Sequence, residues 1–164
     1  MHLLTRAADA YDTDDEVNLT GYAESLAVYS ASVAGLLLAA RARGRSLPEH
    51  YSVQDLAIGG MATHKLTRLL SRSSVTSPLR APFTEFQGPA GSGEHLEKPR
   101  SGHGVRHTVG ELLTCPFCLG VWVGTAYVAG MAFAPRPTRA LAAVLTVVGA
   151  SDALQHGYSR LRGD

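Results

Sequence analysis

The chain has 164 residues, the length of one soluble domain or of roughly three to five membrane spans. Its net charge of +1 and pI near 7.9 provide no bulk positive field, so nucleic acid is not expected as a partner. The two cysteines lie three positions apart, which is too few and too close for a disulfide-stapled secreted scaffold. The mean hydropathy of +0.02 is ordinary for a soluble protein, but the apolar residues are concentrated in runs between clusters of charge.

The first twenty residues carry a cluster of acidic side chains and lack the basic flank and apolar core of a secretory signal. We therefore predict an acidic flexible tail over residues 1–20. Residues 21–70 are predicted to form two N-terminal helices. The first holds the uncharged run Ser25–Ala40, which reaches the length of a membrane span once Tyr22 and Ala23 are included.

The second predicted helix, Val53–Leu70, has apolar residues at helical spacing, but four polar or charged residues interrupt them. It spans the membrane only if the cations near its C-terminal end reach the headgroups. The following residues, 71–110, contain four prolines, six glycines and no clear periodicity. We therefore predict one long Pro/Gly-rich loop there.

The clearest signature is an uncharged stretch of 24 residues, Leu112–Pro135, which includes the sequence Cys-Pro-Phe-Cys near its start. A soluble chain rarely contains such a stretch, so we predict a membrane span. Gly120, Gly124 and Gly130 have the small-residue spacing that lets helices approach closely in lipid. These glycines are therefore predicted to support a homo- or hetero-oligomer.

Residues 111–158 are predicted to form a CxxC-led helical hairpin, and a basic tail follows at 159–164. The expected fold class is an all-α helical membrane protein with three to four transmembrane helices, depending on whether residues 53–70 span the bilayer. With four spans, the side of the long loop carries eight arginines and lysines against five on the opposite side, which favours a cytoplasmic loop. We expect a multi-pass protein of the cell membrane, with the lipid bilayer as its partner.

Cys115 and Cys118 are the candidate catalytic residues. We predict that Thr114 caps the following helix and places Cys115 in its first turn, where unpaired amide groups and the helix dipole stabilise a thiolate. The motif resembles the redox motif of glutaredoxins, but no βαβ unit and no second cysteine pair accompany it. A thiol redox role therefore competes with the simpler interpretation that both cysteines pack as small hydrophobic residues.

Zinc is the cofactor that this region offers as an alternative, and no other cofactor is predicted. A closed zinc site needs four ligands, which Cys115 and Cys118 could complete together with His103 and His107. His95 is a further option. The order of these ligands is not that of a standard zinc finger.

Charged side chains near the apolar segments support two further hypotheses. Asp55, His64 and Asp152 could form a polar path through the membrane, which would indicate transport. A basic cluster at the predicted membrane edge is expected to contact anionic lipid headgroups. Its members are Lys65, Arg68, Arg72 and Arg80.

Three segments carry a distinctive combination of motifs: Lys65–Leu69 (KLTRL), Val75–Phe83 (VTSPLRAPF) and Gly110–Val123 (GELLTCPFCLGVWV). Over about Val53 to Tyr158 the chain resembles an uncharacterised bacterial membrane family, domain of unknown function 1360. The resemblance implies a multi-pass membrane protein of bacterial origin. The family has no established activity, so no catalytic residue follows from it.

The packing signature and the absence of a complete catalytic set favour a non-enzymatic membrane protein with a structural or interaction role. A membrane thiol redox or zinc-binding protein that uses Cys115 and Cys118 is the alternative. A soluble enzyme is the third hypothesis, in which Leu112–Pro135 is a buried core helix.

Overall fold

The structure, a computed structural model, describes residues 11, 17–102 and 104–163, and most of the acidic tail predicted for residues 1–20 lies outside them. The chain is mostly helical and contains one two-stranded sheet. The elements with their bounds are α2 (Leu19–Ala42), α3 (Val53–Arg72), η1 (Ser74–Thr76), α4 (Ser77–Arg80), β1 (Thr84–Pro89), β2 (His95–Pro99), α5 (Val105–Thr114), α6 (Pro116–Phe133) and α7 (Pro135–Arg162).

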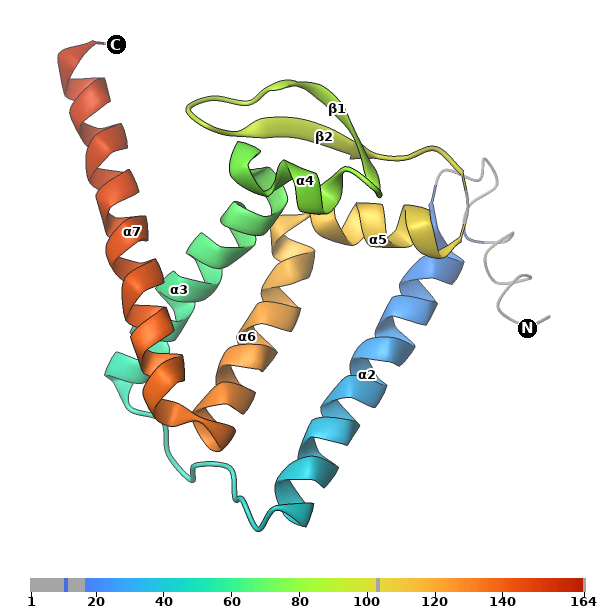
Figure 1. Cartoon of the computed structure of the whole chain (residues 1–164), viewed down its shortest axis with the longest axis vertical. Helices are drawn as coiled ribbons and strands as arrows, with labels where there is room; N and C mark the ends of the chain where they lie inside the picture. The colour runs from blue at the N-terminus through green and yellow to red at the C-terminus, as the bar shows by residue number, and fades with distance from the viewer. Residues whose placement is uncertain (1–10, 12–16, 103, 164) are drawn as a thin grey trace.

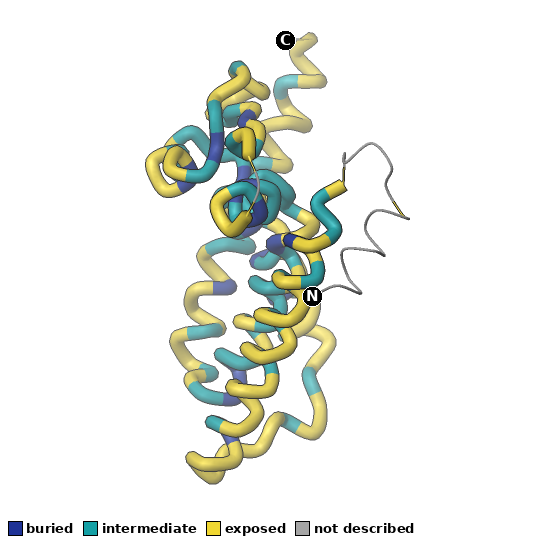
Figure 2. Tube along the Cα trace, turned by 90° about the vertical axis from the view of Figure 1, so that its right-hand side faces the viewer, coloured by how far each residue is buried: buried dark blue, intermediate teal, exposed yellow. Residues whose placement is uncertain are grey.

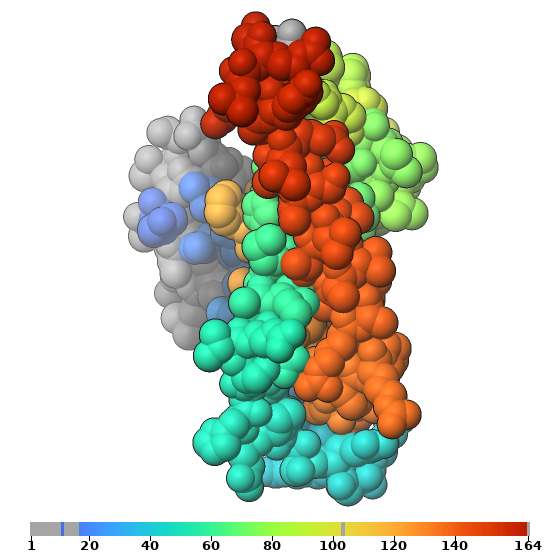
Figure 3. Space-filling model, turned by 90° about the vertical axis from the view of Figure 1, so that its left-hand side faces the viewer, coloured from blue at the N-terminus to red at the C-terminus, as the bar shows by residue number. Residues whose placement is uncertain are grey.

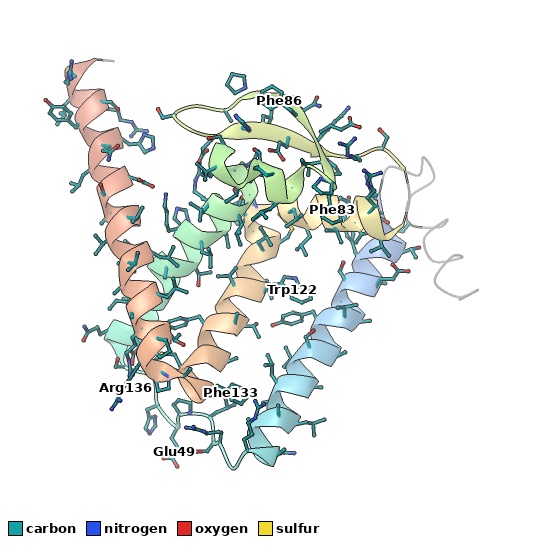
Figure 4. The ribbon with its side chains drawn as sticks, in the orientation of Figure 1. Glu49, Phe83, Phe86, Trp122, Phe133 and Arg136 are labelled. Atoms are coloured by element: carbon teal, nitrogen blue, oxygen red, sulfur yellow. A yellow bond between two sulfur atoms is a disulfide. The ribbon has the colours of Figure 1, made fainter. Side chains whose placement is uncertain are left out.

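Three of the long helices pack together, because α3 contacts both α6 and α7 along much of their length. The fourth long helix, α2, packs against α6 and, at its start, against α5 (Figure 1). Tyr29 of α2 makes the main contact: its hydroxyl lies 2.7 Å from Oγ1 of Thr125, and its ring meets that of Trp122 edge to face at 5.2 Å. Figure 4 shows Trp122 on the side of α6 that faces α2. We call these four helices the bundle.

The stretch predicted as a loop, residues 71–110, contains regular structure. Strands β1 and β2 pair antiparallel as a hairpin, with Thr84 opposite Pro99 and Pro89 opposite His95, and the short helix α4 precedes them. The all-α fold class is therefore correct only in its helical majority. The strands have only six and five residues and include prolines, so they lack the long alternating pattern by which a strand is recognised in a sequence.

The hairpin, α4, α5 and the C-terminal end of α3 form a small unit at one end of the bundle, which we call the cap (Figure 1). Helix α5 lies across the ends of α2 and α6, and strand β2 of the hairpin packs against it. Gly110 makes this contact close, because a Cβ at this position would lie 2.6 Å from the carbonyl oxygen of Phe83. Figure 4 shows Phe83 and Phe86 in the cap, and Glu49, Phe133 and Arg136 at the opposite end of the molecule.

The cap and the bundle bury different kinds of residue. The buried polar residues all lie in the cap or in the half of α3 next to it: Thr67, Ser71, Arg80, Thr84, Glu97 and Thr108. The buried apolar residues lie in the bundle and are mostly small, whereas large apolar side chains of the bundle are exposed. Figure 2 shows the exposed surface along the bundle helices. Examples of exposed side chains are Leu26, Val28, Leu38, Val121, Val144 and Val147.

Two of the described helices, α2 and α6, are long and apolar enough to cross a membrane by length and composition. They coincide with the predicted spans at Ser25–Ala40 and Leu112–Pro135. The second stretch differs at its start, because its first residues belong to α5 and the apolar helix begins at Pro116. Spanning by α3 and α7 stays a prediction.

Candidate functional site

The cysteine pair lies where the chain turns from α5 into α6. Cys115 is the single residue between the two helices and has extended backbone angles, φ −106° and ψ 102°. Pro116 explains this break, because its ring disfavours helical geometry in the preceding residue while its fixed φ suits the first position of a new helix. The sequence therefore ends α5 and starts α6 at the motif itself.

Cys115 caps α6, so the prediction that Thr114 does so is wrong. The Cys115 sulfur accepts a hydrogen bond from the backbone N–H of Cys118, with an N to Sγ distance of 3.1 Å. The Thr114 hydroxyl instead donates back to the carbonyl oxygen of Gly110 within α5. The Cys115 sulfur thus occupies the position at which a helix N-terminus stabilises negative charge most directly.

The two cysteines form a disulfide, and their Cα atoms are 5.3 Å apart. Cys118 is exposed, whereas Cys115 is half-buried. Phe117 between them is 88% exposed, so the motif lies on the surface and is not packed into a core. Cys118 is therefore accessible to solutes or to lipid, whereas Cys115 is partly buried at the helix start. Packing of the cysteines as small hydrophobic residues stays an alternative to redox activity.

Glu111, one turn before Cys115, is engaged in anchoring α2. Its carboxylate accepts hydrogen bonds from the Tyr22 hydroxyl at 3.0 Å and from the Asn18 amide at 2.6 Å. His107 approaches the same carboxylate, with Nε2 3.8 Å from Oε1. These contacts join the start of α2 to α5, so the Glu111 carboxylate has a structural role.

The predicted zinc ligands are only partly within the described residues, because His103 lies outside them. His107 donates from Nδ1 to the carbonyl oxygen of Arg100, and His95 is in the hairpin, where Nδ1 lies 2.9 Å from the Ser77 hydroxyl. Among the residues that the structure describes, no three His, Cys, Asp or Glu side chains gather as a metal site. Zinc binding therefore stays a hypothesis.

The largest fully buried side chain of the cap is Arg80, which is 1% exposed. Its guanidinium makes a two-point contact with the Glu97 carboxylate, through Nε at 2.9 Å and Nη2 at 2.7 Å. It also donates to the carbonyl oxygens of Leu70 and Ser73 at the end of α3. The prediction that Arg80 contacts lipid headgroups is therefore wrong, since its donors are used inside the protein and join α3, α4 and β2.

Glu97 lies in the predicted loop and was not a candidate in the sequence. Burial by itself raises the pKa of its carboxyl, but hydrogen bonds from Arg80, Thr84 and Ser77, together with the Arg80 charge, outweigh burial and lower the pKa from 4.5 to about 2. The glutamate is therefore charged at neutral pH. The one sequence signal for this pair is the arginine within the Val75–Phe83 motif.

Two other members of the predicted basic cluster are ion-paired. Lys65 pairs with Asp152 of α7, and Arg68 makes a two-point contact with Glu94 of the hairpin. These pairs line a polar cleft of about 560 Å³ between α3, the hairpin turn and α7, and Figure 3 shows α7 running beside α3. The lipid contact predicted for Lys65, Arg68 and Arg72 stays a prediction.

The predicted polar path is divided between two places. Asp55 lies at the start of α3 and pairs with Arg139 at the start of α7, with Oδ1 2.9 Å from Nε. Asp152 pairs with Lys65 nearer the cap, and His64 lines an adjoining pocket beside that pair. Asp55 and Asp152 therefore belong to two separate ion pairs between α3 and α7, and His64 lies next to the second.

The three glycines predicted for helix contacts have different surroundings. A Cβ at Gly130 would lie 2.6 Å from Oγ1 of Thr138, so this glycine allows α7 to turn back closely on α6. A Cβ at Gly120 or Gly124 would meet nothing within 4 Å. These two are open on the outer face of α6, and contact with another helix there stays a prediction.

A protein-family model, described as "Protein of unknown function (DUF1360)", matches residues 58–158. The chain belongs to this family. The matched region contains the cap, α6 and most of α3 and α7, whereas α2 lies before it. The chain is also 32% identical over 91 residues to the sporulation protein YjcA of Bacillus subtilis (strain 168), a match that covers 54% of this chain and 77% of that protein. No solved structure matches the chain.

Proposed function

We propose that this DUF1360 protein is an integral membrane protein whose bundle lies in the lipid bilayer and whose cap lies at the membrane surface, in a structural or interaction role. The reversal of burial supports this most directly. In water, the exposed leucines and valines of α2, α6 and α7 would leave extended apolar helix surfaces facing the solvent, which soluble monomers rarely carry. In a bilayer the same apolar side chains contact lipid acyl chains, and the cap remains in water.

The cap is proposed to face the cytoplasm. The cap side of a four-span arrangement carries eight arginines and lysines and the opposite side five, and positive residues are retained on the cytoplasmic side. Helix α5 fits the boundary between the two phases, since it lies across the ends of α2 and α6 (Figure 1). The bilayer is then the first partner, and Lys65, Arg68 and Arg72 are near enough to the cap to meet headgroups.

Carbonate extraction of bacterial membranes tests the location. We expect the chain to stay in the membrane pellet at alkaline pH and to be released by detergent. Recovery in the carbonate supernatant would contradict the proposal and favour a soluble protein.

Orientation is tested on intact cells by labelling the reduced cysteines with a membrane-impermeant maleimide. Labelling only after cell lysis is expected for a cytoplasmic cap, and labelling of intact cells would reverse the orientation.

The disulfide favours a second function, thiol redox activity at the membrane surface. The two cysteines are bonded at a helix N-terminus and Cys118 is exposed, the arrangement in which CxxC motifs exchange electrons. Thiol titration and zinc analysis of one detergent-purified sample separate the alternatives. Two thiols that appear only after reduction, without zinc, support redox activity. Stoichiometric zinc and two thiols blocked by it would support the metal site instead.

Replacement of both cysteines by serine separates the two functions in cells. If the role is structural, the variant is expected to keep its membrane level and its partners. Loss of a thiol-dependent activity at unchanged membrane level would show that the cysteines act chemically. Serine suits this test because it preserves the size of the side chain and can still cap α6.

A further inference from the structure

The two cysteines of the disulfide are not equivalent in this structure. Cys118 is exposed in the first turn of α6, while Cys115 is half-buried at the break between α5 and α6. The backbone amide of Cys118 also donates a hydrogen bond to the Cys115 sulfur, with an N to Sγ distance of 3.1 Å. Access therefore favours attack at Cys118, and electrostatics favour negative charge on Cys115.

We infer that an incoming thiolate attacks the Cys118 sulfur and that Cys115 is the leaving thiolate, so that the pair oxidises a dithiol through a mixed disulfide on Cys118. This inference rests on the redox function proposed above and assigns a separate task to each cysteine. A thiol with a lower pKa leaves faster in thiol–disulfide exchange. The amide of Cys118 and the dipole of α6, an 18-residue helix, lower the free energy of the Cys115 thiolate.

The reaction balances without a further oxidant. One thiolate of the dithiol forms a bond to the Cys118 sulfur, the bond between the Cys115 and Cys118 sulfurs breaks, and Cys115 leaves with the electron pair. The second thiolate of the dithiol then attacks its partner's sulfur in the mixed disulfide and releases the Cys118 thiolate. The substrate loses two electrons and two protons, and both cysteines are protonated to thiols.

The reverse direction has the same division of tasks. The Cys118 thiolate attacks a substrate disulfide, and the Cys115 thiolate then attacks the Cys118 sulfur to release the substrate as a thiol. Cys115 is suited to this step because its sulfur is held at the helix cap, next to Cys118. The chemical class of substrate is therefore a dithiol or its disulfide, in which the two sulfurs can reach each other.

Glutathione is a useful probe because it carries a single thiol. Its mixed disulfide lasts until a second glutathione or the released cysteine displaces it, and rapid acid quenching traps it before then. Oxidised full-length protein in detergent is mixed with reduced glutathione, quenched with acid and mapped by peptide mass spectrometry. We expect the adduct on Cys118 in several-fold excess over Cys115. An excess on Cys115 would overturn the assignment and leave the redox function standing.

Single variants test the charge argument without the disulfide. Cys118→Ser leaves Cys115 alone, and Cys115→Ser leaves Cys118 alone, so the pH profile of alkylation by iodoacetamide reports each thiolate separately. We expect Cys115 to react at the lower pH, and a lower profile for Cys118 would contradict the inference. Circular dichroism of both variants checks that the helices are intact. Failure of glutathione either to form an adduct or to free the two thiols in the wild type would remove the redox function itself.

Discussion

The cap buries charged and polar residues, whereas the bundle buries mainly small apolar ones. The cap encloses a charged pair, Arg80 and Glu97, and satisfies the polar atoms of that pair with hydrogen bonds from α3, α4 and β1. The bundle encloses mainly alanines and presents its larger aliphatic side chains outward. Under the membrane proposal the two regions meet different solvents, with water around the cap and lipid around the bundle. The boundary between them, at α5 and the cysteine pair, is then where water and lipid are expected to meet.

The largest effect is expected from breaking the charge pair of the cap. Arg80→Met leaves the buried Glu97 carboxylate without its cation, which costs roughly 3–5 kcal/mol of unfolding free energy. Chemical unfolding in detergent measures this loss. The double variant Arg80→Met/Glu97→Leu, which removes both charges, is expected to recover much of it. A single variant as stable as the wild type would mean that the cap does not depend on this pair.

A charge placed on the bundle surface tests the other half of the comparison. Val28 is 58% exposed near the middle of α2, and Val28→Arg is expected to oppose insertion by roughly 2.5–3.5 kcal/mol. The measurement is the amount of protein in the membrane fraction. Phe86→Arg in the exposed part of the cap is the matched control and should leave that amount unchanged. Equal levels for both variants would indicate that α2 does not lie in lipid.

The pKa of Glu97 predicts a specific acid sensitivity of the cap. Since this pKa is about 2 in the folded protein and 4.5 ordinarily, the ionised carboxylate stabilises the fold fully above pH 4.5. That contribution declines below pH 4.5 and is lost as the pH falls through about 2, and it amounts to about 3 kcal/mol at most. Unfolding free energies measured across this window check the prediction. Glu97→Gln should remove most of the slope, and an unchanged slope would assign it to other carboxylates.

A pair of glycines provides the smallest and most closely matched test. Gly110→Ala in α5 is expected to destabilise the cap by roughly 1–3 kcal/mol, because its Cβ would press against the Phe83 carbonyl oxygen. Gly124→Ala in α6 meets no atom of the chain and is expected to stabilise the helix by up to about 1 kcal/mol. Thermal unfolding in detergent compares the two. A strong loss at Gly124 would indicate a contact with another helix on that face, as the predicted oligomer requires.

The two apolar helices follow from the sequence alone, because α2 and α6 are apolar runs whose helical form and length depend on local composition. Pro116 also favours a helix boundary at the cysteines, but the sequence placed Thr114 at the cap where the fold has Cys115. The family match agrees with the motifs read from the chain between Lys65 and Val123. These features depend on residues that are close together in the chain, so they can be predicted from local sequence patterns.

The partners of the charged residues follow from the fold and not from the sequence. Arg80 was assigned to the membrane surface together with the cations near the end of α3, and Glu97, which neutralises it, is separated from it by a turn and a strand. The hairpin was missed for the same reason, because its short strands are stabilised by that buried pair and by α5. The redox site lies between these cases: the sequence supplied the two sulfurs, and the fold determined that Cys115 is the cap and Cys118 the exposed partner.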